Sequence, residues 1–198
     1  MGNIVDRTIT VQGCTVHYLE AGAPGGRDVL LLHGMKFSAA TWQELGTLDR
    51  LADAGWHAIA LDMPGFGGSP PCDLGTGEVL AAVITGLGLQ RPVLVGPSMG
   101  GRIVLEFVPD HPGLAGGMVL VGAVGVEENR DRLAEIRLPT LIVWGGEDAV
   151  SPVANSDILA SEIAGARKMV IDGAPHPCYL ESPDTWHAAL LDFLATLS

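Results

Sequence analysis

The sequence predicts an α/β fold with a mostly parallel, doubly wound sheet and an N-terminal hairpin. Three observations lead to this prediction: short apolar runs recur along the chain, glycine or proline bounds each run, and segments with helical spacing lie between the runs. Continuous apolar runs suit strands that are buried on both faces of a sheet. Strands that alternate with helices favour right-handed crossovers between parallel strands. The chain has 198 residues and neither a repeat nor a long linker, so we expect one domain over residues 1–198.

The hairpin is expected from two β-rich stretches, residues 8–11 and 15–19, which flank the turn Gln12-Gly13. The buried strands are expected at the six apolar runs, residues 29–32, 57–61, 92–95, 118–121, 140–144 and 168–171. In an open sheet of this class, ligands bind at the carboxyl ends of the strands. The residues that directly follow each run are therefore the first candidates for a functional site.

Apolar residues recur every three or four positions between these runs, as they do on one face of a helix. This spacing predicts helices around residues 42–51 and 79–87, and another after the turn at residues 96–101. Ser182 followed by Pro183 is typical of an N-cap and a first helical position, so a terminal helix is expected from there.

Composition and charge exclude several classes of protein. Lysine and arginine number 11 and aspartate and glutamate 23, which gives a net charge of −12. Such an acidic surface repels a phosphate backbone, so we expect no nucleic-acid partner. The longest uncharged run, residues 111–126, contains a proline and five glycines and is shorter than the 20 or so residues of a spanning helix, so we expect no membrane segment.

The three cysteines are few, odd in number and without metal-ligand spacing. We expect Cys14, Cys72 and Cys178 to be reduced thiols, with no metal site. The first ten residues include Asp6 and Arg7 and have no apolar core, so no secretory signal is expected. Both observations favour a cytoplasmic protein.

Residues 96–100 form a G-x-S-x-G motif between the run at 92–95 and a helix-like segment. Glycines two positions before and after Ser98 let a strand and a helix cross closely on a tight turn that exposes the hydroxyl. A serine needs a base to attack, and the base needs an acid to orient it. Asp148 and His176 follow the runs at 140–144 and 168–171, so they are the expected acid and base. Glu147 competes for the acid role but is expected to be an exposed loop charge. The histidines that follow no such run, His17 among them, are expected to be ordinary loop residues.

An oxyanion hole requires backbone N–H donors beside the nucleophile. One should be the amide of Met99, directly after Ser98. The other should come from the loop after the run at 29–32, where the Met35 amide is the candidate.

The chain resembles the α/β-hydrolase superfamily in the order of its motifs, which are Leu-Leu-His33-Gly34, Asp62-Met-Pro-Gly65-Phe-Gly67, the Ser98 turn, Gly145-Gly-Glu-Asp148 and His176. It is similar to the small lidless group of abhydrolase domain-containing protein 14 in segments 33–38, 41–43, 45–48, 97–98, 176–180 and 186–187. The resemblance implies an α/β-hydrolase fold and hydrolysis of short acyl esters. It also implies acetyl transfer from lysine to coenzyme A. Because vertebrate members are described as binding a general transcription factor subunit, it implies a protein partner as well.

Two features bear on the expected site. Larger members of the superfamily insert a helical lid after the sixth strand, but residues 127–137 here have room for about one helix. We therefore expect no lid domain and an open site that admits a small acyl group. Pro175 stands where the superfamily usually has glycine before the catalytic histidine. Since proline fixes φ, the loop of His176 is expected to be stiffer or shifted.

We therefore expect a serine hydrolase that acts on small acyl esters or related activated acyl groups and requires no cofactor. Two alternatives stay open: an acyltransferase or deacetylase with an acceptor other than water, such as coenzyme A, and a slow-turnover binding protein on the same fold. Lys36 and Phe37 are candidate substrate-binding residues, for an anionic group and for the acyl group respectively. Trp42 could line the acyl pocket, although core packing suits it better, and Cys178 is assigned no role.

Overall fold

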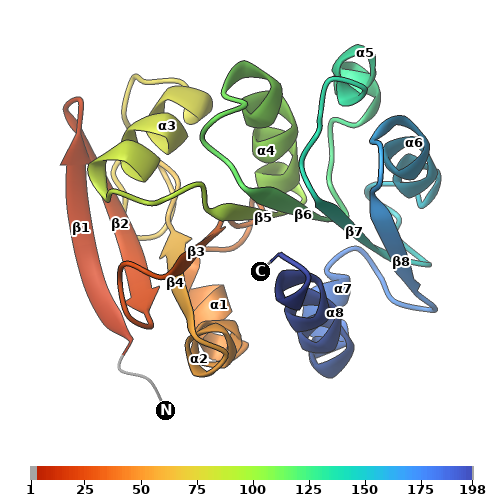
Figure 1. Cartoon of the computed structure of the whole chain (residues 1–198), viewed down its shortest axis with the longest axis horizontal. Coiled ribbons are helices and arrows are strands. Elements are labelled where there is room, and N and C mark those ends of the chain that lie inside the picture. Colours follow the sequence, from red (N-terminus) through yellow and green to blue (C-terminus); the bar gives the residue numbers. More distant parts are fainter. Residues whose placement is uncertain (1–3, 198) are drawn as a thin grey trace.

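The computed structural model describes residues 4–197, in which eight strands form a single sheet of order β1-β2-β4-β3-β5-β6-β7-β8 (Figure 1). The strands are β1 (Val5–Val11), β2 (Cys14–Ala21), β3 (Arg27–Leu31), β4 (Trp56–Leu61), β5 (Val93–Pro97), β6 (Gly117–Val121), β7 (Thr140–Gly145) and β8 (Arg167–Ile171). The pairs β1–β2 and β2–β4 are antiparallel, and all other neighbours are parallel. The predicted mostly parallel sheet with an N-terminal hairpin is confirmed. Met1–Asn3, the start of the segment analysed for a secretory signal, lie outside the described residues.

Helices cover both faces of the sheet (Figure 1). One face carries α1 (Ala39–Glu44), α2 (Thr47–Asp53), α7 (Cys178–Glu181) and α8 (Pro183–Ala195). The other carries α3 (Thr76–Gly86), α4 (Met99–Asp110), α5 (Arg130–Leu133) and α6 (Ala154–Glu162). Side chains of a strand alternate between two apolar clusters: Leu30 packs in the cluster under α3 and α4, and Leu31 packs in the cluster under α2 and α8. The central strands are therefore buried on both faces, as their apolar runs predicted, whereas the edge strands β1 and β8 are partly exposed.

The helices differ in detail from the sequence prediction. The single helix expected over residues 42–51 is divided into α1 and α2 by Gly46, whose φ of 77° interrupts the helical backbone. Ser182 precedes α8 as predicted, but its hydroxyl makes no capping hydrogen bond. The spacing did not predict α6 or α7. Between β6 and β7 the chain forms only a short 3-10 helix, Glu127–Asn129, followed by α5, so no lid domain stands over the sheet in residues 4–197.

The expectation of three reduced thiols is wrong for two of them. Cys14, at the hairpin turn, forms a disulfide with Cys72, which lies 58 positions later in the loop before α3, and their Cα atoms are 5.6 Å apart. Only Cys178 is a free thiol in the described residues. Disulfides are rare in the cytosol, so the cysteine argument for a cytoplasmic protein loses its basis. In the part of the chain that the structure describes, every helix is too short or too polar to traverse a bilayer.

Candidate active site

Ser98 lies at the turn between β5 and α4, at the carboxyl edge of the sheet. Its backbone has a φ of 50° and a ψ of −114°, a combination that residues with side chains rarely adopt. The flanking glycines allow the strand and the helix to approach closely. A Cβ atom on Gly96 would lie 2.4 Å from the carbonyl oxygen of Gly100, and one on Gly100 would lie 2.9 Å from the Cβ of Leu32. The turn therefore presents the Ser98 hydroxyl at the edge of the sheet.

Ser98, His176 and Asp148 come together from the loops after β5, β8 and β7. His176 Nε2 lies 2.8 Å from Ser98 Oγ, and His176 Nδ1 lies 2.8 Å from Asp148 Oδ2. When Nδ1–H donates to the carboxylate, Nε2 is free to accept the hydroxyl proton of Ser98. The three residues thus form one hydrogen-bonded chain with the geometry that a nucleophile, a base and an acid require.

The carboxylate that contacts the His176 imidazole belongs to Asp148 and not to the neighbouring Glu147. The side chain of Asp148 is fully buried. Its Oδ1 accepts hydrogen bonds from the amides of Val150 (2.9 Å) and Ser151 (2.8 Å), which leaves Oδ2 for the imidazole. Glu147 is exposed, as the sequence analysis expected of a loop charge.

The amides of Met35 and Met99 lie near Ser98, on the loop after β3 and at the start of α4 respectively. Met99 is the first residue of α4, and Met35 follows Gly34, where a Cβ atom would lie 3.6 Å from the Cβ of Ser98. Within residues 4–197, neither amide donates to a backbone carbonyl. Both N–H groups therefore remain available to a developing oxyanion, and this role stays a prediction.

A mostly apolar cavity of about 430 Å³ opens at Ser98, and its apolar lining includes Pro97, Val121, Val124, Val150, Pro177 and Tyr179. A more polar hollow of about 520 Å³ adjoins it, between the loop after β3, α1 and residues 65–67. Lys36 and Phe37, the candidate substrate-binding residues, line both. Trp42 instead belongs to the core: it is fully buried, donates to the carbonyl of Leu32 at 2.8 Å, and packs against Trp186.

Two residues beside His176 have limited chemical consequences. Pro175 is exposed, and His176 still reaches both partners at 2.8 Å, so the proline does not shift the imidazole out of the chain. Burial and the charge of Asp148 raise the pKa of the Cys178 thiol to about 12, so this buried thiol stays protonated and unreactive. Among the described residues, no group of three or more His, Cys, Asp or Glu could hold a metal ion.

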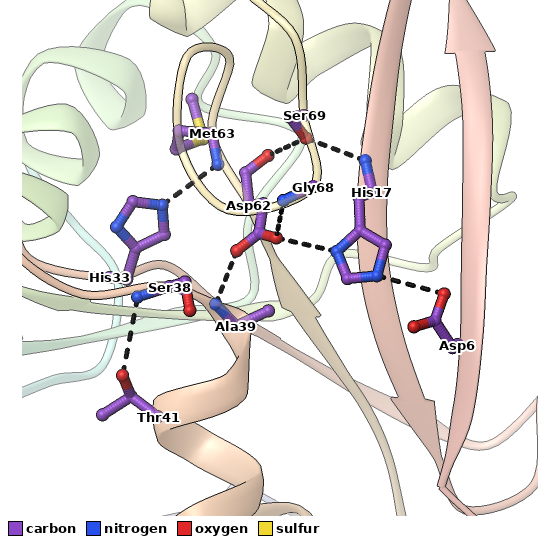
Figure 2. A network of polar contacts seen from close by, with 10 residues as sticks. All are labelled: Asp6, His17, His33, Ser38, Ala39, Thr41, Asp62, Met63, Gly68 and Ser69. Carbon is purple, nitrogen blue, oxygen red and sulfur yellow. Dashed lines mark hydrogen bonds and ion pairs between the residues drawn. The ribbon is translucent and has the colours of Figure 1, made fainter.

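A second polar cluster joins His17, Asp62 and Ser69 by hydrogen bonds and contacts Ala39 (Figure 2). Asp62 belongs to a motif of the sequence, but the cluster itself was not predicted. His17 lies in β2, not in the expected loop, and its Nδ1 is 2.7 Å from Asp62 Oδ2. Asp62 directly follows β4, and Asp148 likewise lies in the loop that follows β7, so the place of Asp62 at a strand end was a usable signal. His17 carried no such signal.

Comparisons with known proteins show the family to which the chain belongs. The family model described as alpha/beta hydrolase fold matches residues 29–135. The "Putative protein-lysine deacylase ABHD14B" of Rattus norvegicus is 40% identical over an alignment of 204 positions that covers 96% of this chain and 96% of the relative. Protein ABHD14A of Danio rerio is 35% identical and covers 98% of this chain, which spans 77% of that relative.

Solved structures show the same fold. The "predicted CIB-like hydrolase" from Thermoplasma acidophilum matches with a TM-score of 0.93 at 30% identity, over 98% of this chain and 99% of that one. The esterase EaEST from Exiguobacterium antarcticum matches with a TM-score of 0.87 at 20% identity, over 96% of this chain and 100% of that one, and this likeness shows the fold alone. The chain therefore belongs to the α/β-hydrolase family, and within it the chain is an ABHD14-like hydrolase.

Proposed function

We propose that the protein is a serine hydrolase that cleaves small acyl esters or related activated acyl groups through an acyl-enzyme. The observation that carries the proposal is the hydrogen-bonded chain from Ser98 Oγ through His176 to Asp148, with both contacts at 2.8 Å. Ser98, the first of these three residues, lines an apolar cavity that suits an acyl group.

In the proposed reaction, Ser98 Oγ attacks the acyl carbonyl carbon while His176 Nε2 accepts the hydroxyl proton. The carbonyl oxygen becomes negative and is stabilised by the amides of Met35 and Met99. The intermediate collapses as the imidazolium returns the proton to the leaving group, and Asp148 stabilises the imidazolium throughout. Water then attacks the acyl-enzyme: His176 takes its proton and passes it to Ser98 Oγ as the acid is released.

The open cavity supports a small acyl group, because residues 4–197 form no lid that would enclose a long acyl chain. The name of the ABHD14B relative adds acyl-lysine amides to the candidate substrates. A panel of esters from acetyl to long-chain acyl groups tests this choice, and we expect turnover to fall as the chain lengthens. A clear preference for long-chain esters would contradict the small-acyl proposal.

Ser98→Ala tests the nucleophile directly. We expect this variant to lose turnover, whereas Ser161→Ala, a matched change on an exposed face of α6, should keep it. A wild-type burst of leaving group without steady-state turnover would instead favour the slow-turnover binding protein.

Acyl transfer to an acceptor such as coenzyme A is a second candidate, and Lys36 is the observation that favours it. Lys36 is exposed, lines both hollows and makes no ion pair within residues 4–197, so its ammonium is available to a phosphate. Analysis of the products formed in the presence of coenzyme A decides whether water or the coenzyme A thiol is the acyl acceptor. Acyl-coenzyme A formed in preference to free acid by the wild type, and lost in Lys36→Met, would establish the transferase.

A further inference from the structure

The loop that carries the Met35 amide is held at both of its ends by consecutive residues that follow β4 (Figure 2). At its start, Nε2 of the buried His33 accepts a hydrogen bond from the Met63 amide at 3.1 Å. At its end, the Ala39 amide donates to Asp62 Oδ1 at 2.6 Å. Residues 33–39 are thus anchored on one short segment.

The first anchor also orients the peptide that supplies the Met35 amide. Burial lowers the pKa of His33, so its ring is neutral, with Nε2 accepting and Nδ1–H donating to the carbonyl of Gly34 at 2.8 Å. The Phe37 amide donates to the same carbonyl at 3.0 Å. In a trans peptide the N–H points opposite to the C=O. The Met35 N–H therefore points away from these two donors.

The second anchor depends on a carboxylate that is almost fully buried. Asp62 is 2% exposed, and its Oδ2 accepts hydrogen bonds from the Gly68 amide and from His17 Nδ1, both at 2.7 Å. His17 Nε2 lies 3.1 Å from Asp6 Oδ1 on the neighbouring strand. A Cβ atom on Gly68 would lie 2.8 Å from His17 Cγ, so the ring is packed in place.

We propose that His17 is a positioning residue for the hydrolysis proposed above: through Asp62 it holds residues 33–39 so that the Met35 amide faces the oxyanion. Burial alone lowers the pKa of His17, but the hydrogen bonds and charges of Asp6 and Asp62 outweigh it and raise that pKa above its ordinary value. Because each ring nitrogen lies beside a carboxylate oxygen, a ring that donates from both nitrogens compensates the charge of the buried Asp62. Without the His17 ring, the Asp62 carboxylate is expected to turn toward water and to lose its hydrogen bond with the Ala39 amide.

The variants His17→Leu and His17→Asn separate this role from packing. An asparagine can place its amide nitrogen where Nδ1 stands and donate to Asp62, whereas leucine cannot. The readout is the rate at which a fluorophosphonate reagent labels Ser98, followed by intact mass, because its P=O oxygen occupies the oxyanion position. We expect about a tenfold slower labelling in His17→Leu, and within about threefold of the wild type in His17→Asn, since a small displacement of a donor costs up to about a hundredfold.

His57→Leu is the matched control. His57 also lies between two carboxylates, with Nδ1 2.8 Å from Asp28 Oδ1 and Nε2 2.9 Å from Glu20 Oε1, but at the amino edge of the sheet. It should lose stability without slowing the labelling of Ser98. Hydrogen exchange over residues 33–39 gives a second readout that needs no chemistry at Ser98, and it should quicken in His17→Leu and not in His57→Leu.

Labelling of His17→Leu at the wild-type rate, or an equal slowing in both leucine variants, would overturn the positioning role. Failure of His17→Asn to recover the rate would also count against it. A wild-type protein that is not labelled at Ser98 would instead refute the proposed function, while the hydrogen-exchange comparison would still decide whether His17 holds the loop.

Discussion

Replacing Asp148 with asparagine tests the proposed role of its carboxylate while keeping the size and shape of the side chain. Asp148 Oδ1 accepts from the amides of Val150 (2.9 Å) and Ser151 (2.8 Å), so an asparagine must turn its carbonyl oxygen toward these two donors. Its NH2 group then faces His176 Nδ1, which has to accept. The ring proton moves to Nε2 and points at Ser98 Oγ, where His176 can no longer act as a base.

The structure also indicates how far kcat should fall in Asp148→Asn. Turning the asparagine amide around would restore the tautomer but leave two backbone N–H groups, the buried one of Ser151 and the part-buried one of Val150, facing an NH2 group. An unsatisfied buried donor costs about 1–3 kcal/mol, so the competent form lies about 2–6 kcal/mol higher. This corresponds to a loss of about 30-fold to 20,000-fold in kcat. We expect a value near a thousandfold, with the fold retained because each hydrogen bond keeps a partner.

The assay is kcat and KM on one acetyl ester, with chemical unfolding of each variant. Glu147→Gln is the control, because its side chain is exposed, and it should change kcat by less than about twofold. If Glu147→Gln proves the more damaging change, the acid has been misplaced by one residue. If neither variant loses turnover, Ser98, His176 and Asp148 do not act together as the catalytic residues.

Three further predictions concern the surroundings of the site. Pro175→Gly should lower kcat severalfold by loosening the His176 loop while the unfolding free energy falls by less than about 1 kcal/mol, and an unchanged rate would mean that the proline is neutral. Replacing Cys14 and Cys72 by serine should cost about 4 kcal/mol in urea unfolding, from the entropy of a loop with 58 residues of separation, and thiol titration of the denatured, unreduced wild type should find one thiol. Because the pKa of His17 is raised, its contribution to stability should be complete below about pH 6.5 and decline as pH rises through the folded-state pKa; equal pH dependence in His17→Asn would contradict this.

The sequence predicted the site residues that directly follow buried strands. It missed the contacts that depend on how the antiparallel strands pair. Ser98, Asp148 and His176 each come after an apolar run, and parallel strands bring their carboxyl ends to one edge, so their meeting could be expected. The sequence also favoured Asp148 over Glu147, and the structure gives the reason: Asp148 accepts from two backbone donors of a local turn, whereas Glu147 is exposed.

The Cys14–Cys72 disulfide and the His17–Asp62 contact could not be predicted in the same way. Both depend on how the hairpin lies against the loop after β4, and this follows from the antiparallel register that places Tyr18 opposite Leu61. A one-residue shift in that register would turn His17 to the other face of the sheet. Neither composition nor spacing contains that register.

The backbone of Ser98 implies a trade-off between stability and activity. A φ of 50° with a ψ of −114° is a conformation that glycine tolerates, and in other residues such a backbone costs about 1–3 kcal/mol. The extra freedom of glycine in the unfolded chain returns about 0.5–1 kcal/mol of that difference. A protein with glycine at this position would therefore unfold at a higher denaturant concentration than the wild type but would lack the proposed nucleophile. Selection for stability alone would favour that glycine, and the proposed role of Ser98 as nucleophile accounts for a serine in this turn.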